Sequence, residues 1–270
     1  MSRETRTLPA LAAGPVEMPF AILNWSEAIE RDLAWNEHSH PFHELLWNER
    51  GASTAVVGTR VWTVTSALGL WMPAGTLHSG SAAAGTHCRA SFFGVDSVSS
   101  ISPVPVGVEV TPLLRLLLER LADTALPPRS RAVTEAMVLD VLAPSSRELL
   151  VQMPVSDLLR PVADAVRADP GDRRTLADWA AELGVSARTI TRAFNAETAT
   201  SFARWVAAVR AQRAVELLGR GWDADAVAEE VGYRSASAFG AAFRRTTGLT
   251  PGAFRAGRAV PIATADVPTA

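Results

Sequence analysis

Residues 225–255, DAVAEEVGYRSASAFGAAFRRTTGLTPGAFR, repeat the pattern of an earlier stretch, residues 176–205, LADWAAELGVSARTITRAFNAETATSFARW. In each stretch a short segment rich in small residues leads to a glycine, and a second short segment ends at a phenylalanine. The two phenylalanines, Phe194 and Phe243, lie 49 residues apart. A helix, a glycine-containing turn and a second helix are the parts of a helix-turn-helix unit. The sequence therefore predicts two such units in tandem.

The residues between and after the predicted helices fit this interpretation. Gly184 and Gly232 allow a turn conformation that a Cβ would obstruct. Ser186 and Ser235 stand at the N-cap positions of the second helices, whose N-terminal ends could then enter the major groove of DNA. Arginine is well suited to bidentate contact with guanine. The residues expected to face outward from the first unit are Arg188, Thr189, Thr191 and Arg192.

Residues 173–257 as a whole resemble the DNA-binding domain of AraC-type transcriptional regulators, most clearly in the closing segment GLTPGAFR. The resemblance implies that two recognition helices enter successive major grooves on one face of promoter DNA. It also implies which residues meet the bases. Those of the first helix are Arg188, Thr191 and Arg192, and the equivalent places in the second are Ser237 and Ala241.

The second unit departs from a base-reading surface, because its SASAFGAA segment has almost no polar side chain that could bond to a base edge. We expect this helix to contact mainly phosphates, through its backbone and through Arg244 or Arg245. The first unit would then carry most of the sequence specificity. Ala199 also stands where the family often has glycine, so the turn after the first unit is expected to differ.

The helical pattern extends over residues 154–258, which we interpret as one DNA-binding domain. Apolar periodicity, caps and glycines predict about seven helices in this half. Their expected ranges are 156–168, 175–183, 187–195, 201–219, 223–230, 236–246 and 251–257.

Residues 19–110 have a pattern typical of β-structure. Short apolar runs such as STAVVG, RVWTVT and RASFFGV are broken by Gly, Pro, Asn or Ser every 8 to 12 residues. This regular spacing of apolar runs and turn residues predicts a β-sandwich or a β-barrel. The expected fold class is thus a multidomain β + α protein, with an N-terminal barrel and an all-α tandem helix-turn-helix domain. Residues 1–18 and 259–270 are interpreted as flexible tails.

Residues 111–153 connect the two halves. Thr111 is a cap with Pro112 at the first helical position, and TPLLRLLLERLADTAL places five leucines on one helical stripe: Leu113, Leu114, Leu117, Leu118 and Leu121. RAVTEAMVLDVLA predicts a second helix. Two apolar helices after a barrel could cap it or pair with a second copy, and pairing would make the protein a homodimer.

The segment HSHPFHELLWNERG, residues 38–51, holds three of the chain's five histidines. It fits the pattern H-x-H-x(3)-E-x(6)-G, and GLWMPAGTLH, residues 69–78, fits G-x(3)-P-x-G-x(2)-H. Together they resemble the two motifs of the cupin barrel. The resemblance implies a metal site whose ligands are His38, His40, Glu44 and His78. Alternate residues of a strand share a face, so positions 38, 40 and 44 are expected to point into one barrel.

Three imidazoles and a carboxylate suit Fe(II), Mn(II), Ni(II) or Zn(II), and the lack of thiolates argues against a structural zinc site. A bulge at Pro41 would let His43 replace one of these ligands. The alternative is a metal-free pocket, lined by histidines, that holds an organic effector. Five of the eight tryptophans fall in the first 71 residues; most are expected in the barrel core, and one or two in the pocket.

Charge and cysteine content restrict the function classes. Residues 1–149 carry 11 arginines and 15 acidic residues, a balance of −4, whereas residues 150–260 carry 15 arginines and 12 acidic residues, a balance of +3. The two halves are therefore expected to have different partners. Cys88 is the only cysteine, so no internal disulfide forms. Neither a signal peptide nor a membrane span is evident, and we expect a cytoplasmic protein without a membrane partner.

These patterns together predict a DNA-binding transcriptional regulator whose barrel senses a metal ion or a small ligand. Its partners would be promoter DNA, the effector and, for an activator, RNA polymerase. We do not expect an enzyme, because no catalytic acid, base or cofactor motif accompanies the ligands. The rival interpretations are a cupin metalloenzyme fused to a DNA-binding domain and a barrel that serves only for dimerisation.

Overall fold

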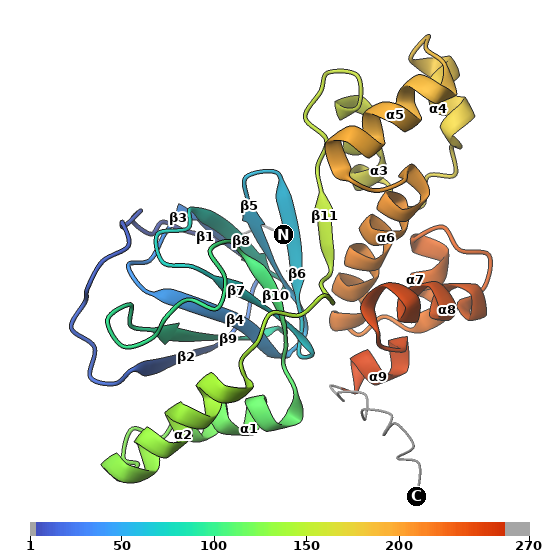
Figure 1. Cartoon of the computed structure of the whole chain (residues 1–270). Helices are drawn as coiled ribbons and strands as arrows, with labels where there is room; N and C mark the ends of the chain where they lie inside the picture. Colours follow the sequence, from blue (N-terminus) through green and yellow to red (C-terminus); the bar gives the residue numbers. More distant parts are fainter. Residues whose placement is uncertain (1–3, 257–270) are drawn as a thin grey trace, which may run out of the picture.

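The computed structural model describes residues 4–256, and Figure 1 shows a β-rich part followed by a helical part. The β-rich part consists of two sheets in which every strand pair is antiparallel except β1–β3. The six-stranded sheet contains, in order, β1 (Glu4–Arg6), β3 (Leu33–His38), β8 (His78–Ala82), β5 (Ser53–Val57), β6 (Arg60–Val64) and β11 (Leu150–Gln152). The five-stranded sheet contains β10 (Val106–Glu109), β7 (Leu68–Met72), β4 (His43–Arg50), β9 (His87–Phe93) and β2 (Ile22–Ala28).

Two helices, α1 (Pro112–Leu121) and α2 (Pro128–Val141), pack against the five-stranded sheet. Thr111 accepts a hydrogen bond from Leu114 N and Pro112 starts α1, which confirms the predicted cap. Four of the five predicted leucines are buried in a core with Leu45, Trp71 and Phe93; Leu113 lies at the margin of the stripe and is 47% exposed. The helix α1 is therefore amphipathic, and its apolar face covers the barrel.

The interpretation of residues 1–18 as a flexible tail was wrong for the part that the structure describes. The strand β1 pairs in parallel with β3, and Leu11 N and Gly14 N donate to Ser39 O and Pro41 O. The segment covers backbone groups that β3 would otherwise expose as an edge strand. The predicted C-terminal tail, residues 259–270, lies outside the described residues. The linking segment also differs from expectation, because β11 adds a strand to the barrel by pairing with β6.

The helical part contains the seven predicted helices. They are α3 (Arg160–Ala168), α4 (Leu176–Glu182), α5 (Ala187–Thr198), α6 (Phe202–Gly219), α7 (Ala224–Glu230), α8 (Ala236–Thr247) and α9 (Pro251–Arg255). Side-chain oxygens cap six of the seven, and the caps explain why the boundaries could be predicted. No helix among residues 4–256 combines the length and apolarity that crossing a bilayer requires.

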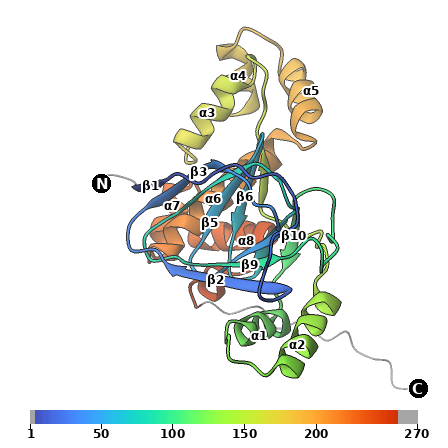
Figure 2. The ribbon, with the colours of Figure 1, turned by 90° about the vertical axis from the view of Figure 1, so that its left-hand side faces the viewer.

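The long helix α6 packs against the barrel. Gln212 Nε2 donates to Val61 O of β6 and Trp205 Nε1 donates to Gln152 O of β11, each at 2.8 Å. Arg220 at the end of α6 pairs with Asp32 at 3.0 Å. Ala52, Leu68 and Leu149 share a core with α6, α7, α8 and α9. Figure 2 shows that α3, α4 and α5 project from one end of the barrel, opposite to α1 and α2.

Candidate metal, ligand and DNA sites

The pairing of β3 with β8 brings three histidines together. His38 ends β3 and is paired with His78, which begins β8. His40 lies in the turn that follows β3. One ring nitrogen of each of the three histidines lies within 4.8 Å of those of the other two. His38 and His78 are buried, whereas the His40 side chain is 21% exposed.

Glu44 reaches the same cluster from β4 of the other sheet. Its Oε2 lies 3.9 Å from His40 Nε2 and 3.6 Å from His78 Nε2. Positions 38, 40 and 44 face one cavity, as expected, but they do so from separate elements and not from one strand. The chain leaves β3 at His38 and enters β4 only at His43, so the residues converge from two sheets and a turn. Pro41 lacks a backbone N–H for the ladder, which is consistent with the break.

The buried carboxyl of Glu44 is not satisfied by the described residues. Its Oε2 has no hydrogen-bond partner among them, although the side chain is only 6% exposed. Burial raises the pKa of Glu44 to about 8. A buried polar atom without a partner is unfavourable and calls for an explanation such as an ion.

Backbone carbonyls orient two of the imidazoles. His38 Nδ1 lies 2.7 Å from Asn36 O, and His78 Nδ1 lies 2.9 Å from Thr76 O. A carbonyl only accepts, so each Nδ1 carries a hydrogen, and in the neutral form of the ring Nε2 keeps a free lone pair, as in metal sites. Burial lowers the pKa of His78 to about 4; burial and the nearby imidazoles of His78 and His38 do the same for His40. These two rings are therefore neutral at pH 7.

His43 stands apart from the cluster. Its Nδ1 accepts a hydrogen bond from Ala74 N at 2.9 Å, and its ring lies 5.4 Å from that of Trp71. The side chain thus faces the core beneath α1 and α2, away from Glu44. Burial lowers the pKa of His43. The structure does not bring His43 together with the other predicted ligands.

The donor set fits a transition metal. Three imidazoles and one carboxylate suit Mn, Fe, Ni or Zn. The thiol of Cys88 does not belong to the group, and burial raises the pKa of Cys88 to about 12. The orphaned oxygen of Glu44 supports the same fit. His38, His40, His78 and Glu44 are therefore the residues that could hold an ion.

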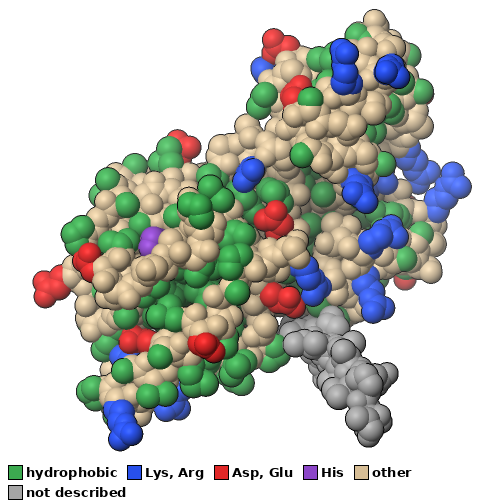
Figure 3. Space-filling model, viewed as in Figure 1, with side chains coloured by type: hydrophobic (Ala, Val, Ile, Leu, Met, Phe, Trp, Pro, Cys, Tyr) green, Lys and Arg blue, Asp and Glu red, His purple; other side chains and the backbone are tan. Residues whose placement is uncertain are grey.

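A cavity of about 260 Å³ adjoins the histidine cluster inside the barrel. Besides His38, His40, Glu44 and His78, its lining is largely apolar and aromatic, with Trp25, Trp35, Leu46, Ala90 and Phe92 among its members. Figure 3 shows a histidine at the barrel surface with hydrophobic side chains around it. The histidine cluster thus forms part of the wall of a largely apolar cavity, and its member His40 is partly exposed.

The helical part contains both predicted helix-turn-helix units, formed by α4 with α5 and by α7 with α8. Ser186 and Ser235 cap α5 and α8, and Gly184 and Gly232 have φ of 65° and 77°. The apolar residues on the inner faces of α5 and α8 are fully buried, namely Ile190, Phe194, Phe239 and Phe243. The opposite faces of α5 and α8 are consequently exposed.

On α5, Arg188 and Arg192 are exposed and have no hydrogen bond or ion pair with any residue of the described chain. The two threonines are engaged: Thr189 Oγ1 lies 2.8 Å from Ser186 Oγ, and Thr191 Oγ1 donates to Ala187 O. On α8 the exposed residues are Ser237, Ala238, Ala241, Arg244 and Arg245. Both helices thus present arginines that lack protein partners.

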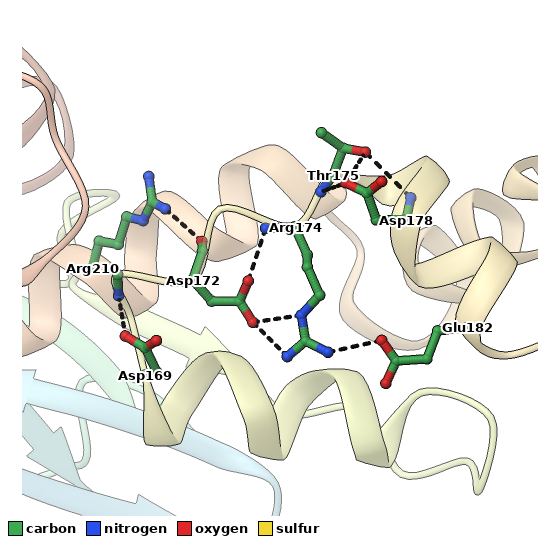
Figure 4. A network of polar contacts seen from close by, with 8 residues as sticks. Asp169, Asp172, Arg174, Thr175, Asp178, Glu182 and Arg210 are labelled. Atoms are coloured by element: carbon green, nitrogen blue, oxygen red, sulfur yellow. Dashed lines mark hydrogen bonds and ion pairs between the residues drawn. The ribbon is translucent and has the colours of Figure 1, made fainter.

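Other arginines of this part are held by the protein. Arg174 bridges Asp172 and Glu182 at 2.6 and 2.8 Å, and Figure 4 shows both contacts. Its guanidinium also lies 3.6 Å over the Trp179 ring. Arg210 donates to Asp172 O. These contacts tie the start of α4 to α6. In Figure 3 arginines gather on the helical part, and those of α5 and α8 have no hydrogen bond or ion pair within residues 4–256.

Two family models match the chain. Residues 26–137 match the one described as AraC-like ligand binding domain, and residues 179–257 match the one described as helix-turn-helix domain. The first match covers most of the barrel, α1 and most of α2, and the second covers nearly all of both helix-turn-helix units. The chain belongs to the AraC family of transcriptional regulators.

Relatives of this AraC-family chain are themselves named as regulators. The HTH-type transcriptional regulator NimR of Escherichia coli is 27% identical over 222 residues, which are 80% of this chain and 81% of NimR. The HTH-type transcriptional regulator RipA of Corynebacterium glutamicum is 39% identical over 106 residues, 39% of this chain and 32% of RipA. The solved DNA-binding domain of AdpA, in complex with a target DNA, is 31% identical with a TM-score of 0.36, covering 37% of this chain and 92% of that one.

The AraC-family barrel contains residues at its cavity that sequence patterns did not indicate. Arg6 and Leu8 come from the segment interpreted as a tail, and no local signal marks them. Of the five early tryptophans, three line the cavity, namely Trp25, Trp35 and Trp47, whereas Trp62 and Trp71 lie in the core away from it; Trp47 is as deeply buried as these two. The strand register determines whether each tryptophan lies in the cavity wall or in the core.

Proposed function

We propose that this AraC-family regulator senses a divalent transition metal through His38, His40, His78 and Glu44. The observation that carries the proposal is Glu44 Oε2, a buried oxygen without a hydrogen-bond partner among the described residues, 3.6 Å from His78 Nε2. A bound cation would offset the burial of that carboxylate. The neutral imidazoles support the proposal, because their Nε2 lone pairs need not lose a proton first.

The regulatory step would be a shift between two arrangements of the barrel and the DNA-binding part. A metal ion shifts that equilibrium only by its differential affinity for the two arrangements. The four ligands come from β3, the turn at His40, β4 and β8, so an ion would tie both sheets together at one end of the barrel. Metal binding at this end of the barrel would thereby alter the affinity of the protein for promoter DNA.

Elemental analysis of the protein purified without chelator tests the proposal. We expect stoichiometric metal in the wild type and none in the double variant His38→Ala/His40→Ala. His43→Ala is the matched control, since it removes a histidine of the same segment that lies outside the cluster and should leave the metal in place. Absence of metal from the wild type, even after anaerobic loading, would contradict metal sensing.

An organic effector in a metal-free barrel is the second candidate, and the cavity beside the histidines favours it. We further propose that the protein is not an enzyme, in keeping with the regulator names of its relatives. A screen for substrate turnover on the metal-loaded protein checks this, because activity lost in Glu44→Gln would revive the enzyme interpretation.

For the DNA site we propose that Arg188 and Arg192 read bases and that Arg244 and Arg245 contact phosphates. Thr189, Thr191, Ser237 and Ala241 would lie against the groove as part of the same two faces. The support is the exposure of both helices and the absence of described partners for the arginines. Affinity should fall steeply with salt; a flat response would argue against DNA as the main partner.

We also propose a homodimer through the outer face of α1 and α2. Large apolar side chains are exposed there: Leu113, Leu116, Val133 and Met137. Sedimentation equilibrium of the purified protein measures the assembly directly. As a DNA-binding regulator the protein would act in the cytoplasm and, as an activator, would contact RNA polymerase.

A further inference from the structure

The cavity beside the histidine cluster has two chemically different ends. One end holds the Nε2 atoms and the unpartnered Glu44 Oε2. The rest of the wall includes the half-buried rings of Trp25, Trp35 and Phe92. Half-buried aromatic rings that face an internal space offer broad apolar contact area to a ligand.

The charged side chains in the wall, other than Glu44, are already paired. Arg6 forms a two-pronged contact with Glu27 at 2.6 and 2.7 Å. Arg89 is held by Glu49. The Asn48 amide donates to Ser53 Oγ and to Val64 O. Apart from a metal ion at the histidine cluster, a carboxylate or phosphate ligand would therefore find no free cation in the wall, and the apolar remainder of the wall disfavours a buried charge.

The size of the cavity restricts the ligand further. Its volume of about 260 Å³ falls just below the range of roughly 300–1,000 Å³ that is common for drug-sized ligands. One or two rings fit this space. The polar end demands a group that supplies an electron pair, because a metal at the cluster can accept a further donor beyond its protein ligands.

We propose that the cavity binds a small, uncharged aromatic molecule with one electron-pair donor, oriented so that the donor meets the histidine cluster and the ring lies among Trp25, Trp35 and Phe92. The donor end of this inference rests on the proposed metal site. The ring end rests on the wall alone. The effector is then a combination of metal and organic molecule.

The probes for the test are 4-phenylpyridine and pyridine, which share the donor nitrogen and differ by one ring. The full-length protein is first titrated with Co(II), whose absorption spectrum reports its ligands. The probes are then titrated into metal-loaded and metal-free protein by calorimetry. We expect 4-phenylpyridine to bind the loaded protein roughly tenfold or more tightly than pyridine, because burying one ring contributes about 1.5–3 kcal/mol.

In the variant Trp35→Leu, 4-phenylpyridine should lose most of its higher affinity relative to pyridine, while Co(II) and pyridine should bind as before. Trp25→Leu provides a second test if Trp35→Leu fails to fold, as judged by circular dichroism. The matched control is Trp222→Leu, the same change at a site between α6 and α7, 42% exposed, which should keep the ratio.

The outcomes separate the two proposals. Equal affinity of pyridine and 4-phenylpyridine for the loaded protein would overturn the aromatic inference and leave the metal site intact. Equal affinity of 4-phenylpyridine for loaded and metal-free protein would overturn the role of the donor. Failure of Co(II) to bind, read from the first titration, would refute the proposed metal site itself and with it the donor end of the inference.

Discussion

Glu44 shows how a single side chain couples burial to ligand chemistry. The carboxyl is 6% exposed, and burial raises its pKa to about 8. Without a cation it therefore holds a proton at pH 7. A metal that binds the carboxylate must displace that proton, so metal binding and proton release are linked.

We predict that metal binding at pH 7 releases about one proton per ion. Since the proton comes from Glu44, apparent metal affinity should increase as the pH rises towards 8 and level off above it. Calorimetry in buffers of different ionisation enthalpy counts the protons. The variant Glu44→Gln should release none and bind more weakly. Proton release that persists in Glu44→Gln would assign the proton to another group.

Arg192 is the residue at which base reading is most directly tested. We predict that Arg192→Ala weakens binding to the specific operator by about 1–3 kcal/mol and random DNA much less. Fluorescence anisotropy at one salt concentration measures both. Arg213→Ala is the control, because Arg213 is paired with Glu216 and Glu230. An equal loss on both DNAs would make Arg192 a phosphate contact.

At the scale of elements, the two helix-turn-helix units end their recognition helices differently. Gly248 follows α8 with φ of 77°, and Ala199 follows α5 with φ of 54°. Within residues 4–256 Ala199 is the only non-glycine residue with positive φ. A Cβ in the left-handed region is unfavourable by about 1–2 kcal/mol. Both turns adopt the left-handed conformation. The turn after α5 differs from the turn after α8 only because Ala199, unlike Gly248, is strained in that conformation.

We predict that Ala199→Gly stabilises the protein by roughly 0.5–1 kcal/mol, the relief of strain exceeding the greater freedom of glycine in the unfolded chain. Urea unfolding measures the change. The control Ala196→Gly, at an exposed position inside α5, should instead destabilise by about 1 kcal/mol. Gly248→Ala should destabilise by about 1 kcal/mol, because a Cβ is strained at φ of 77°, while the exposed guanidinium of Arg147 can move aside. A neutral result for Ala199→Gly would mean that the turn is not strained.

At the scale of the whole molecule, the cavity and the DNA-binding part share a structural boundary. Ser53, Thr54 and Ala55 of β5 line the cavity, and β5 pairs with β6, whose Val61 O accepts from Gln212 of α6. Since α6 lies between the two helix-turn-helix units, a shift of the β5–β6 hairpin would reach both. The contact between Gln212 of α6 and Val61 of β6 is therefore a direct structural link between the cavity and the DNA-binding part.

We predict that in the double variant Gln212→Ala/Arg220→Ala the ratio of the DNA affinities with and without metal falls close to one, while metal affinity stays unchanged. Both side chains join α6 to the barrel, and the coupling free energy depends on contacts that differ between the two arrangements. DNA binding with and without metal gives the ratio. Arg213→Ala again serves as the control. An unchanged ratio in the double variant would show that the coupling takes another route.

The local patterns of the sequence determined the helical half almost completely. Caps such as Ser186 and Ser235, turn glycines and the 49-residue repeat act within a few residues, so they predict helices without tertiary information. The resemblance to the two cupin motifs likewise implied the members of the histidine cluster, because those motifs lie in short contiguous stretches of the sequence.

The tertiary structure alone decided which of these residues meet and what surrounds them. His38 and Glu44 lie on strands of different sheets, His43 faces the core, and Leu8 of the supposed tail reaches the cavity. Such placements depend on strand register, where a shift of one residue exchanges the two faces, and on pairing between segments far apart in sequence. No local pattern encodes either, so the cavity and the contact between α6 and the barrel emerge only when the whole chain has folded.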